Sequence, residues 1–310
     1  MLLNSFVRIM KRSLTLLIIF NEEKKVMEIR NLSKIDFSIV FQAFSRAFAN
    51  YEVQINEEQL ESMLKRRGFN PEFSFAAFDK NQIVAFTFNG IGNFNEIATA
   101  YDTGTGTLEE YRGKGLATNI FEHSIPYLRE IGIKQYLLEV LQHNASAVSI
   151  YKNIGFRITR EFNYFMQKNE KISNEIRPSK SPYFIKQINL YDFHLIIPTF
   201  WDFYPSWQNS IESIIRTPKD FIYMGAFADN ELMGYCVFEP ISGDITQIAV
   251  DKDNRRKGIA SSLLNEMIRL NRHEVIKVIN TDISCNSITA FLRSKNIEIA
   301  GKQFEMMKEI

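Results

Sequence analysis

The sequence predicts two consecutive α/β domains, because one succession of motifs, helices and strands occurs twice. The chain has 310 residues and a hydrophobic share of 45%, which suits two domains that each bury a core. The motif Arg112-Gly113-Lys114-Gly115-Leu116-Ala117 returns 143 residues later as Arg255-Arg256-Lys257-Gly258-Ile259-Ala260. An amphipathic helix pattern, a strand and a helix that starts near an asparagine follow each copy.

Each copy is expected to contain the same elements in the same order. In the first copy we expect a strand at 28–30, helices at 36–48 and 56–67, strands at 73–78, 83–89 and 96–101, a helix after Gly115, a strand at 135–141, a helix at 144–154 and a strand at 156–166. In the second we expect a strand at 183–188, a helical region at 192–215, strands at 221–227, 231–238 and 244–250, a helix after Gly258, a strand at 275–283, a helix at 286–295 and a strand at 297–307. Asn144 and Asn286 are suitable N-caps, and Gly155 and Asn296 suit a left-handed position after the helix. Pro126 is expected to kink or end its helix.

The repeat sets the predicted domain boundaries. The two domains are residues 27–168 and 183–310, and the polar stretch 169–182 is the linker. Residues 1–26 form an N-terminal extension with two open interpretations. Lys11-Arg12 before the apolar run at 14–20 resembles a signal segment, whereas the strand signal at Met27 favours a start of translation there. We expect the second, because no small-residue cleavage site follows the apolar run.

Composition narrows the classes of function. The formal net charge of +1 argues against nucleic acid as the main partner. Two cysteines without framework spacing indicate a reducing, cytoplasmic compartment, and the four scattered histidines predict no metal site. The apolar run at the N-terminus is too short to span a membrane, so no membrane partner is expected. A monomer and a homodimer both stay open.

The repeated motif has the features of an anion-binding turn. The first turn of a helix leaves amide hydrogens without internal partners, and the helix dipole adds partial positive charge there. Gly113 and Gly115 let a phosphate come close to the backbone, and Lys114 adds charge. A single copy could equally be an ordinary basic turn facing water, but two copies in register favour the phosphate site.

Both halves resemble the GNAT superfamily of acyl-CoA-dependent N-acyltransferases. Tyr111–Ala117 matches the loop of that family, and Leu138-Glu139-Val140, Asn144, Tyr151 and Gly155-Phe156 match its second signature. The resemblance implies a mixed sheet that is split in the middle, with acetyl-CoA in the split. It also implies a set of cofactor-binding residues: Thr107, Arg112, Gly113, Lys114, Gly115, Leu116, Ala117 and Asn144 in the first copy, and Arg255, Lys257, Gly258 and Ala260 in the second.

The resemblance implies transfer of an acetyl group from acetyl-CoA to a primary amine of a small molecule or a peptide N-terminus. Tyr151 is the candidate proton donor for the departing thiolate, and Glu139 is the candidate base. Packing of a helix and a solvent-facing glutamate are the plainer roles for these two residues. The tyrosine position of the second copy holds Leu292 or Arg293, so we expect the first copy to be catalytic and the second to be degenerate or regulatory.

Three alternatives stay open. The chain could be a CoA-binding sensor or substrate-binding module without turnover. Catalysis could also reside in the second copy, through Asp282 or a chain of waters. The aromatic stretch Phe200–Trp207 could line an acceptor pocket, form a contact between domains, or belong to a core.

Overall fold

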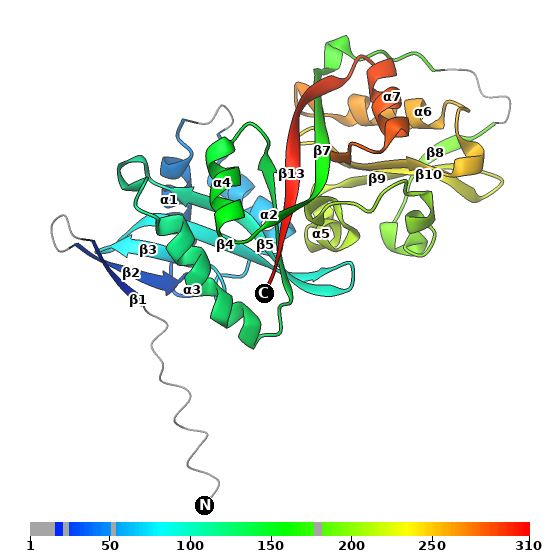
Figure 1. Cartoon of the computed structure of the whole chain (residues 1–310). Helices are drawn as coiled ribbons and strands as arrows, with labels where there is room; N and C mark the ends of the chain where they lie inside the picture. Colours follow the sequence, from blue (N-terminus) through cyan, green and yellow to red (C-terminus); the bar gives the residue numbers. More distant parts are fainter. Residues whose placement is uncertain (1–15, 21–24, 51–53, 177–181) are drawn as a thin grey trace, which may run out of the picture. The chain divides into compact units, whose positions relative to one another are not determined.

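The computed structural model describes residues 16–20, 25–50, 54–176 and 182–310, which divide into two compact units. The first unit comprises the chain up to Leu138 together with Met307–Ile310, and the second comprises Glu139–Met306. Each unit combines a mixed β-sheet with helices, and this confirms the predicted fold class (Figure 1).

The first unit is built on a sheet in the order β1-β2-β3-β4-β5-β6. Its elements are β1 (Leu16–Phe20), β2 (Lys25–Asn31), α1 (Phe37–Ala47), α2 (Glu57–Arg66), β3 (Phe75–Asp79), β4 (Gln82–Phe94), β5 (Ile97–Thr107), η1 (Glu109–Tyr111), α3 (Leu116–Glu130) and β6 (Gln135–Leu141), which ends in the second unit. The strand β4 is buried without interruption over residues 83–90. Because successive side chains of a strand point to opposite faces, this burial means that both faces of β4 are covered.

Part of the N-terminal extension has defined structure. The residues of β1 pair antiparallel with β2, from Leu16 opposite Ile29 to Phe20 opposite Lys25. The two interpretations of the extension, a signal segment or a start at Met27, depend mainly on residues 1–15 and 21–24. These residues lie outside the described part of the chain. The start at Met27 therefore stays a prediction.

The second unit repeats this architecture with the sheet order β13-β7-β12-β11-β10-β9-β8. Its elements are α4 (Ala145–Asn153), β7 (Arg157–Lys168), η2 (Asn169–Lys171), β8 (Phe184–Gln187), η3 (Leu190–Phe193), η4 (Ile197–Phe200), η5 (Trp207–Asn209), α5 (Ile211–Arg216), η6 (Pro218–Asp220), β9 (Ile222–Ala228), β10 (Glu231–Glu239), β11 (Asp244–Val250), η7 (Lys252–Asn254), α6 (Ile259–Leu270), β12 (Val275–Asp282), α7 (Asn286–Ser294) and β13 (Glu298–Glu309), whose end belongs to the first unit. Helices α6 and α7 lie on one face of this sheet, and α5 lies on the other (Figure 1).

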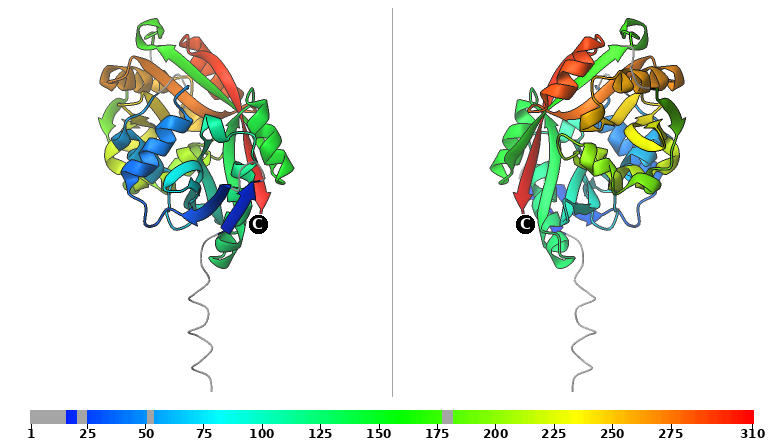
Figure 2. Two further views of the ribbon diagram at one scale, coloured as in Figure 1. Left: turned by 90° about the vertical axis from the view of Figure 1, so that its left-hand side faces the viewer. Right: turned by 90° about the vertical axis from the view of Figure 1, so that its right-hand side faces the viewer.

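The last strands of the two sequence copies are exchanged. Strand β7 closes the first copy in sequence, yet it pairs antiparallel with β12 of the second copy, from Lys168 opposite Val275 to Phe162 opposite Asp282. Strand β13 then lies between β7 and β6. The red β13 and the green β7 run side by side in both views of Figure 2. The compact units therefore do not coincide with residues 27–168 and 183–310, which stay the proposed limits of the two sequence copies.

Close packing holds β7 against β13. A Cβ atom on Gly301 would lie 2.5 Å from the ring of Tyr164, so the glycine lets this ring lie against the backbone of β13. Nearby, Arg160 and Glu305 form an ion pair of 2.6 Å whose side chains are 20% and 4% exposed. Phe165 of β7 belongs to the hydrophobic core that α6 and β12 share.

Three local expectations need correction. Helix α3 does not end at Pro126 but continues to Glu130. Helix α7 takes Cys285 rather than Asn286 as its N-cap residue, without a side-chain cap bond. The region 192–215 is mainly 3-10 turns, and only Ile211–Arg216 is α-helical. Pro198 and Pro205 lie within this region and oppose continuation of a long α-helix.

The exchange of strands predicts an effect of a first-copy residue on the second unit. Phe165→Ala should lower the free energy of unfolding of this unit by about 3–5 kcal/mol, because it empties a fully buried ring position. Met166→Ala, at the next position of β7 and 44% exposed, is the control and should change it by about 0.5 kcal/mol or less. Urea denaturation with hydrogen exchange at the α6 amides measures both. Unchanged protection of α6 in Phe165→Ala would contradict the packing of β7 in this unit.

Candidate functional site

The central parallel strands of each copy separate soon after they pair. Strands β5 and β6 share three residue pairs, which end at Tyr101 opposite Leu137. Strands β11 and β12 share one pair, Asp244 opposite Lys277. In both copies a bulge directly follows the last shared pair, since the register with the neighbouring antiparallel strand shifts beside Thr103 and beside Thr246. Beyond it, the facing edges of the parallel strands have no ladder partner in each other.

A pocket of about 590 Å³ lies at this separation in the second unit. Its walls are residues 245–250 of β11, residues 278–281 of β12, and one face of α7. The loop before α6, including Arg256 and Gly258, forms one end. Residues of the stretch Phe200–Trp207, which we call the aromatic wall, line another side. A pocket of this size holds a cofactor-sized ligand.

The two repeated loops have the same backbone conformation. Gly113 and Gly115 have φ angles of 75° and 70°, and Arg256 and Gly258 have φ angles of 64° and 84°. Arg256 therefore replaces a glycine in sequence while keeping the left-handed conformation that a glycine adopts more easily. The departure of the second copy from the family pattern at this position is one of residue type and not of backbone shape.

Both loops fit a bound phosphate group. Gly115 and Gly258 are the N-cap residues of α3 and α6, so the amides of the next three residues point out of the helix without intrahelical acceptors. A Cβ atom on Gly113 or Gly115 would meet nothing within 4 Å. The space in front of the first loop is therefore open, and a phosphate can approach its amides. Leu116 and Ile259 are buried and anchor the two helices while these amides face away from the core.

The loop arginines act mainly on the protein itself. Arg112 donates from Nε to the carbonyl of Thr107 (3.3 Å) and from Nη2 to the carbonyl of Ala47 (3.3 Å). Arg255 repeats this with the carbonyls of Val250 (3.1 Å) and Phe200 (3.4 Å). Each arginine thus ties its loop to the end of the preceding strand. A direct contact of either guanidinium with a phosphate stays a proposal.

The other loop residues lie where a ligand could reach them. The ammonium of Lys114 lies 5.1 Å from the ring centroid of Tyr111, and Lys257 donates to Asn254 (2.7 Å). Ala117 follows Leu116 in the first turn of α3, and Ala260 of α6 lines the pocket of the second unit.

The candidate residues of the first copy are divided between the two units. Thr107 and the loop 112–117 belong to the first unit, whereas Glu139, Asn144 and Tyr151 belong to the second. The side chain of Asn144 caps α4 by accepting from the amide of Ala147 (3.2 Å). Tyr151 is half-buried on α4, with its ring 5.6 Å from that of Phe156.

Glu139 belongs to a cluster of charges around Arg160. Burial alone would lower the pKa of Arg160. The hydrogen bond and charge of Glu305, with the charges of Glu139 and Asp282, raise that pKa above its ordinary value instead. The raised pKa keeps the guanidinium of Arg160 charged although the side chain is largely buried.

The second copy places no carboxylate at the position of Glu139. Asn280 and Thr281 of β12 are almost fully buried and line the pocket. Leu292 is fully buried in the core of the second unit. Asp282 accepts from the amide and hydroxyl of Ser284 (2.9 and 2.6 Å), so this carboxylate shapes the turn before α7.

Sequence reasoning missed a buried hydrogen-bonded chain on the floor of this pocket. Tyr235 of β10 accepts from Trp201 Nε1 (2.7 Å) and donates to Gln247 Oε1 (2.7 Å), and Gln247 donates to the carbonyl of Asn209 (2.6 Å). Burial raises the pKa of Tyr235 far above its ordinary value, so its phenol stays neutral. Tyr235 comes before the loop motif of the second copy in sequence. The family signature has its tyrosine after that motif, so it gave no reason to consider Tyr235.

Asp202 joins three segments at the rim of the pocket. Its carboxylate accepts from both Nη atoms of Arg255 (3.0 and 2.9 Å) and from the hydroxyl of Ser287 on α7 (2.7 Å). Burial tends to raise the pKa of Asp202. The hydrogen bonds from Arg255 and Ser287, with the charges of Arg255 and Lys252, hold that pKa below its ordinary value.

Comparison with known proteins assigns the family. The acetyltransferase (GNAT) family model matches residues 37–156 and again residues 187–288, so the chain belongs to this family and carries two copies of its domain. N-alpha-acetyltransferase 30 of Schizosaccharomyces pombe is 27% identical over 111 residues, which cover 35% of this chain and 74% of that protein. The uncharacterized N-acetyltransferase YobR of Bacillus subtilis is 24% identical over 144 residues, covering 40% and 55%. N-alpha-acetyltransferase MAK3 of Arabidopsis thaliana is 27% identical over 97 residues, covering 31% and 51%, so the chain spans about half the length of these last two relatives.

Solved structures share the tandem architecture. A tandem GNAT protein from the clavulanic acid biosynthesis pathway matches with a TM-score of 0.68 at 11% identity, covering 91% of this chain and 98% of that one. A GCN5-related N-acetyltransferase from Sphaerobacter thermophilus matches with a TM-score of 0.70 at 12% identity, covering 91% and 95%. At such low identity these likenesses establish the fold alone.

No helix within residues 16–20, 25–50, 54–176 and 182–310 combines the length and the hydropathy of a transmembrane span. The same residues contain no group of three or more His, Cys, Asp or Glu side chains placed to hold a metal ion.

The rim carboxylate predicts a pH-dependent stability. Asp202→Asn should lower the free energy of unfolding at pH 7 by about 1 kcal/mol or less, because the pair is partly exposed. A lowered pKa in the folded state stabilises above the unfolded-state value of about 3.9, and the effect is lost as pH falls through the folded value. The difference between the two proteins should therefore be constant at pH 5–7 and should shrink as the pH falls below about 4. Denaturation at a series of pH values measures this difference, and Asp253→Asn, which changes an exposed carboxylate of η7, is the control. A difference that does not shrink between pH 5 and pH 3 would contradict the prediction.

Proposed function

We propose that the chain is an N-acetyltransferase that moves an acetyl group from acetyl-CoA directly to a primary amine of a small molecule or a peptide N-terminus. The observation that carries the proposal is the pocket of the second unit, where the N-terminus of α6 meets the gap between β11 and β12. The amides of that helix suit a pyrophosphate, and the free strand edges suit an extended chain that carries amide groups.

The acyl thioester supplies an activated carbonyl carbon, and the protein must manage two protons. The attacking amine has to lose a proton, and the departing thiolate has to gain one. Tyr151 is proposed as the acid, because it lies on the helix that Asn144 caps and a phenol with its ordinary pKa near 10 is protonated at neutral pH. Glu139 is proposed as the base, because its carboxylate lies in the cluster of charges around Arg160. Two of the relatives carry the name N-alpha-acetyltransferase, so a peptide α-amine is the first acceptor to test.

A second candidate places the transfer in the second copy. The pocket and the loop before α6 favour transfer in the second copy. The polar side chains that line this pocket, however, form hydrogen bonds with one another. Tyr235 and Asp202, for example, both have protein partners. A water held between these groups would then have to carry the protons. We therefore propose the first copy for the chemistry and the second copy for binding of CoA.

Charge placed in the two loops tests the phosphate sites. Gly115→Glu and Gly258→Glu should each weaken CoA binding at their own copy by at least about tenfold, which corresponds to 1.4 kcal/mol. Gly115→Ala and Gly258→Ala are the controls, because they introduce the same left-handed strain without the carboxylate. Calorimetry on the full chain should show two sites that fall to one in each glutamate variant. Equal binding in the glutamate and alanine variants would show that phosphate does not dock on that turn.

Removal of one hydroxyl tests the acid. Tyr151→Phe keeps the ring against Phe156 and should reduce kcat by roughly 10²–10⁴ in an assay of thiol release. CoA affinity should stay within about threefold, because the pyrophosphate turn keeps its amides. Tyr191→Phe, at a position 59% exposed, is the control.

Two other outcomes assign the function differently. A normal kcat in Tyr151→Phe, with activity lost in Gly258→Glu, would move the transfer to the second copy. Binding of CoA at both loops without thiol release for any amine would make the chain a CoA-binding module.

A further inference from the structure

The aromatic wall has no regular backbone structure of its own. It runs from the last residue of η4 to the first residue of η5, and residues 201–206 between them belong to no helix or strand. Trp201 and Phe203 are half-buried and line the pocket, while Tyr204 between Phe203 and Pro205 is 39% exposed. The position of these rings therefore depends on what holds the backbone of the wall.

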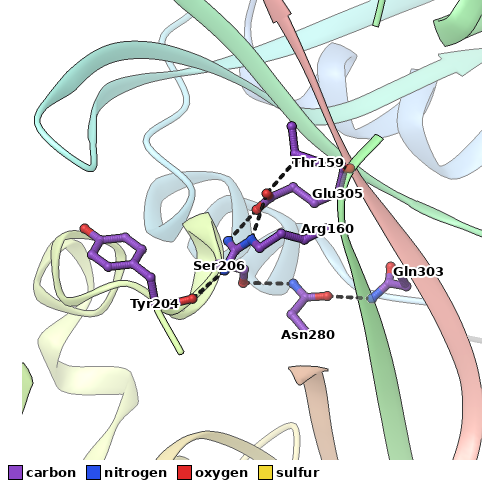
Figure 3. Close-up of polar contacts among 7 residues, drawn as sticks. All are labelled: Thr159, Arg160, Tyr204, Ser206, Asn280, Gln303 and Glu305. Atoms are coloured by element: carbon purple, nitrogen blue, oxygen red, sulfur yellow. Dashed lines mark hydrogen bonds and ion pairs between the residues drawn. The ribbon is translucent and has the colours of Figure 1, made fainter. Parts of the chain in front are cut away.

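The strand exchanged from the first copy supplies one tether. Arg160 of β7 donates from Nη1 to the carbonyl of Tyr204 (2.6 Å), and from Nε and Nη2 to the carboxylate of Glu305 on β13 (2.9 and 2.6 Å). Thr159 donates to the same carboxylate (2.8 Å). In Figure 3 the guanidinium lies between Glu305 and the backbone of Tyr204. The planar fork of arginine lets one side chain make these contacts together.

A second tether runs through the pocket lining. Asn280 of β12 donates to the hydroxyl of Ser206 (3.0 Å) and accepts from Gln303 of β13 (2.8 Å), as Figure 3 shows. The backbone of Asn280 has a φ angle of 55°, a conformation that asparagine tolerates better than most residues. Both tethers end on residues 204–206, which directly follow Phe203. The exchanged strands thus set the position of one side of the pocket.

The surface that the wall offers to a ligand is apolar. The indole nitrogen of Trp201 donates to Tyr235, and the carboxylate of Asp202 is held by Arg255 and Ser287. The hydroxyl of Ser206 accepts from Asn280. Because these polar groups form hydrogen bonds within the protein, the rings of Trp201 and Phe203 are the parts of the wall that can contact a ligand. Flat aromatic rings stabilise an apolar ligand group through buried area.

We propose that Arg160 is a positioning residue for the second-copy pocket, and that the aromatic wall it holds binds an apolar group of the ligand. That group belongs either to the acyl chain of an acyl-CoA or to the body of the amine acceptor. The inference rests on the proposed function, because it takes the pocket to be a CoA site. It adds that a residue of the first sequence copy determines the selectivity of the second.

Tryptophan fluorescence can test the binding of an apolar ligand group, because the chain has two tryptophans. Trp201 lines the pocket and Trp207 is buried beside it, so a change in tryptophan emission on binding should come from Trp201. The probes are CoA alone, acetyl-CoA against hexanoyl-CoA, and ethylamine against 2-phenylethylamine in the presence of CoA. The first pair tests the acyl chain as the source of the apolar group, and the second tests the acceptor. One pair should show at least tenfold tighter binding of its larger member.

Arg160→Lys removes the tether while keeping the charge beside Glu305. It should reduce that preference to less than threefold and leave the affinity for CoA within threefold. The double variant Arg160→Met with Glu305→Met removes both charges of the ion pair and so does not leave Glu305 unpaired. It should reduce the preference in the same way as Arg160→Lys. Trp201→Phe should abolish the emission change on binding, and Trp207→Phe should retain it, since Trp207 is 1% exposed.

Several results would overturn the inference. These are equal binding within both pairs in the native chain, an unchanged preference in Arg160→Lys, or an emission change that survives Trp201→Phe. A parallel loss of CoA and hexanoyl-CoA affinity in Arg160→Lys would also overturn it, because it would indicate a general structural role. No response to CoA itself would contradict the proposed function, whereas a response to CoA without an apolar preference would contradict this inference alone.

Discussion

Strands β11 and β12 pair at one position and then separate, and the features of the second unit follow from that separation. Two neighbouring strands that stop pairing leave backbone amides and carbonyls without a ladder partner. In the second unit a pocket lies at the gap between the two strands, and the N-terminus of α6 lies at one end of this pocket. The bulge beside Thr246 lies just after the last shared pair, where a change of strand direction is easiest.

The loops of the two copies have the same backbone conformation but differ in the side-chain contacts that support it. Arg112 and Arg255 each donate to a carbonyl five residues earlier, and each also reaches a carbonyl of the segment before the meander. Among the described residues, Arg255 alone of the two also binds a carboxylate, that of Asp202, which in turn accepts from Ser287 of α7. The loop of the second copy is therefore tied to its pocket wall and to its last helix, which stiffens a site that has no tyrosine on that helix.

The sequence was sufficient for the repeat and for most of the order of the elements, since these depend on local residues. Gly113 and Gly115 indicated a turn that a phosphate can approach, whereas the left-handed φ angles of both loops are a finding of the structure. The same conformation at Arg256 could not be predicted, because residues other than glycine seldom adopt it. The partner of β7 could not be predicted either. A strand pattern indicates which face is buried but not which of two similar sheets it joins.

The strand exchange also has a consequence for folding during synthesis. Ile310 donates its amide to the carbonyl of Lys134, and Gln142 donates to that of Lys302. Strand β6 pairs with β5 on one side and gains its neighbour on the other side only when β13 has been made. Contacts this distant in sequence form slowly, because a long loop must close before they stabilise anything. While the ribosome completes the second copy, the edge of β6 in the first copy stays without its strand neighbour. An exposed strand edge is a template for pairing with other chains. The nascent first copy is therefore expected to depend on chaperones until β13 emerges.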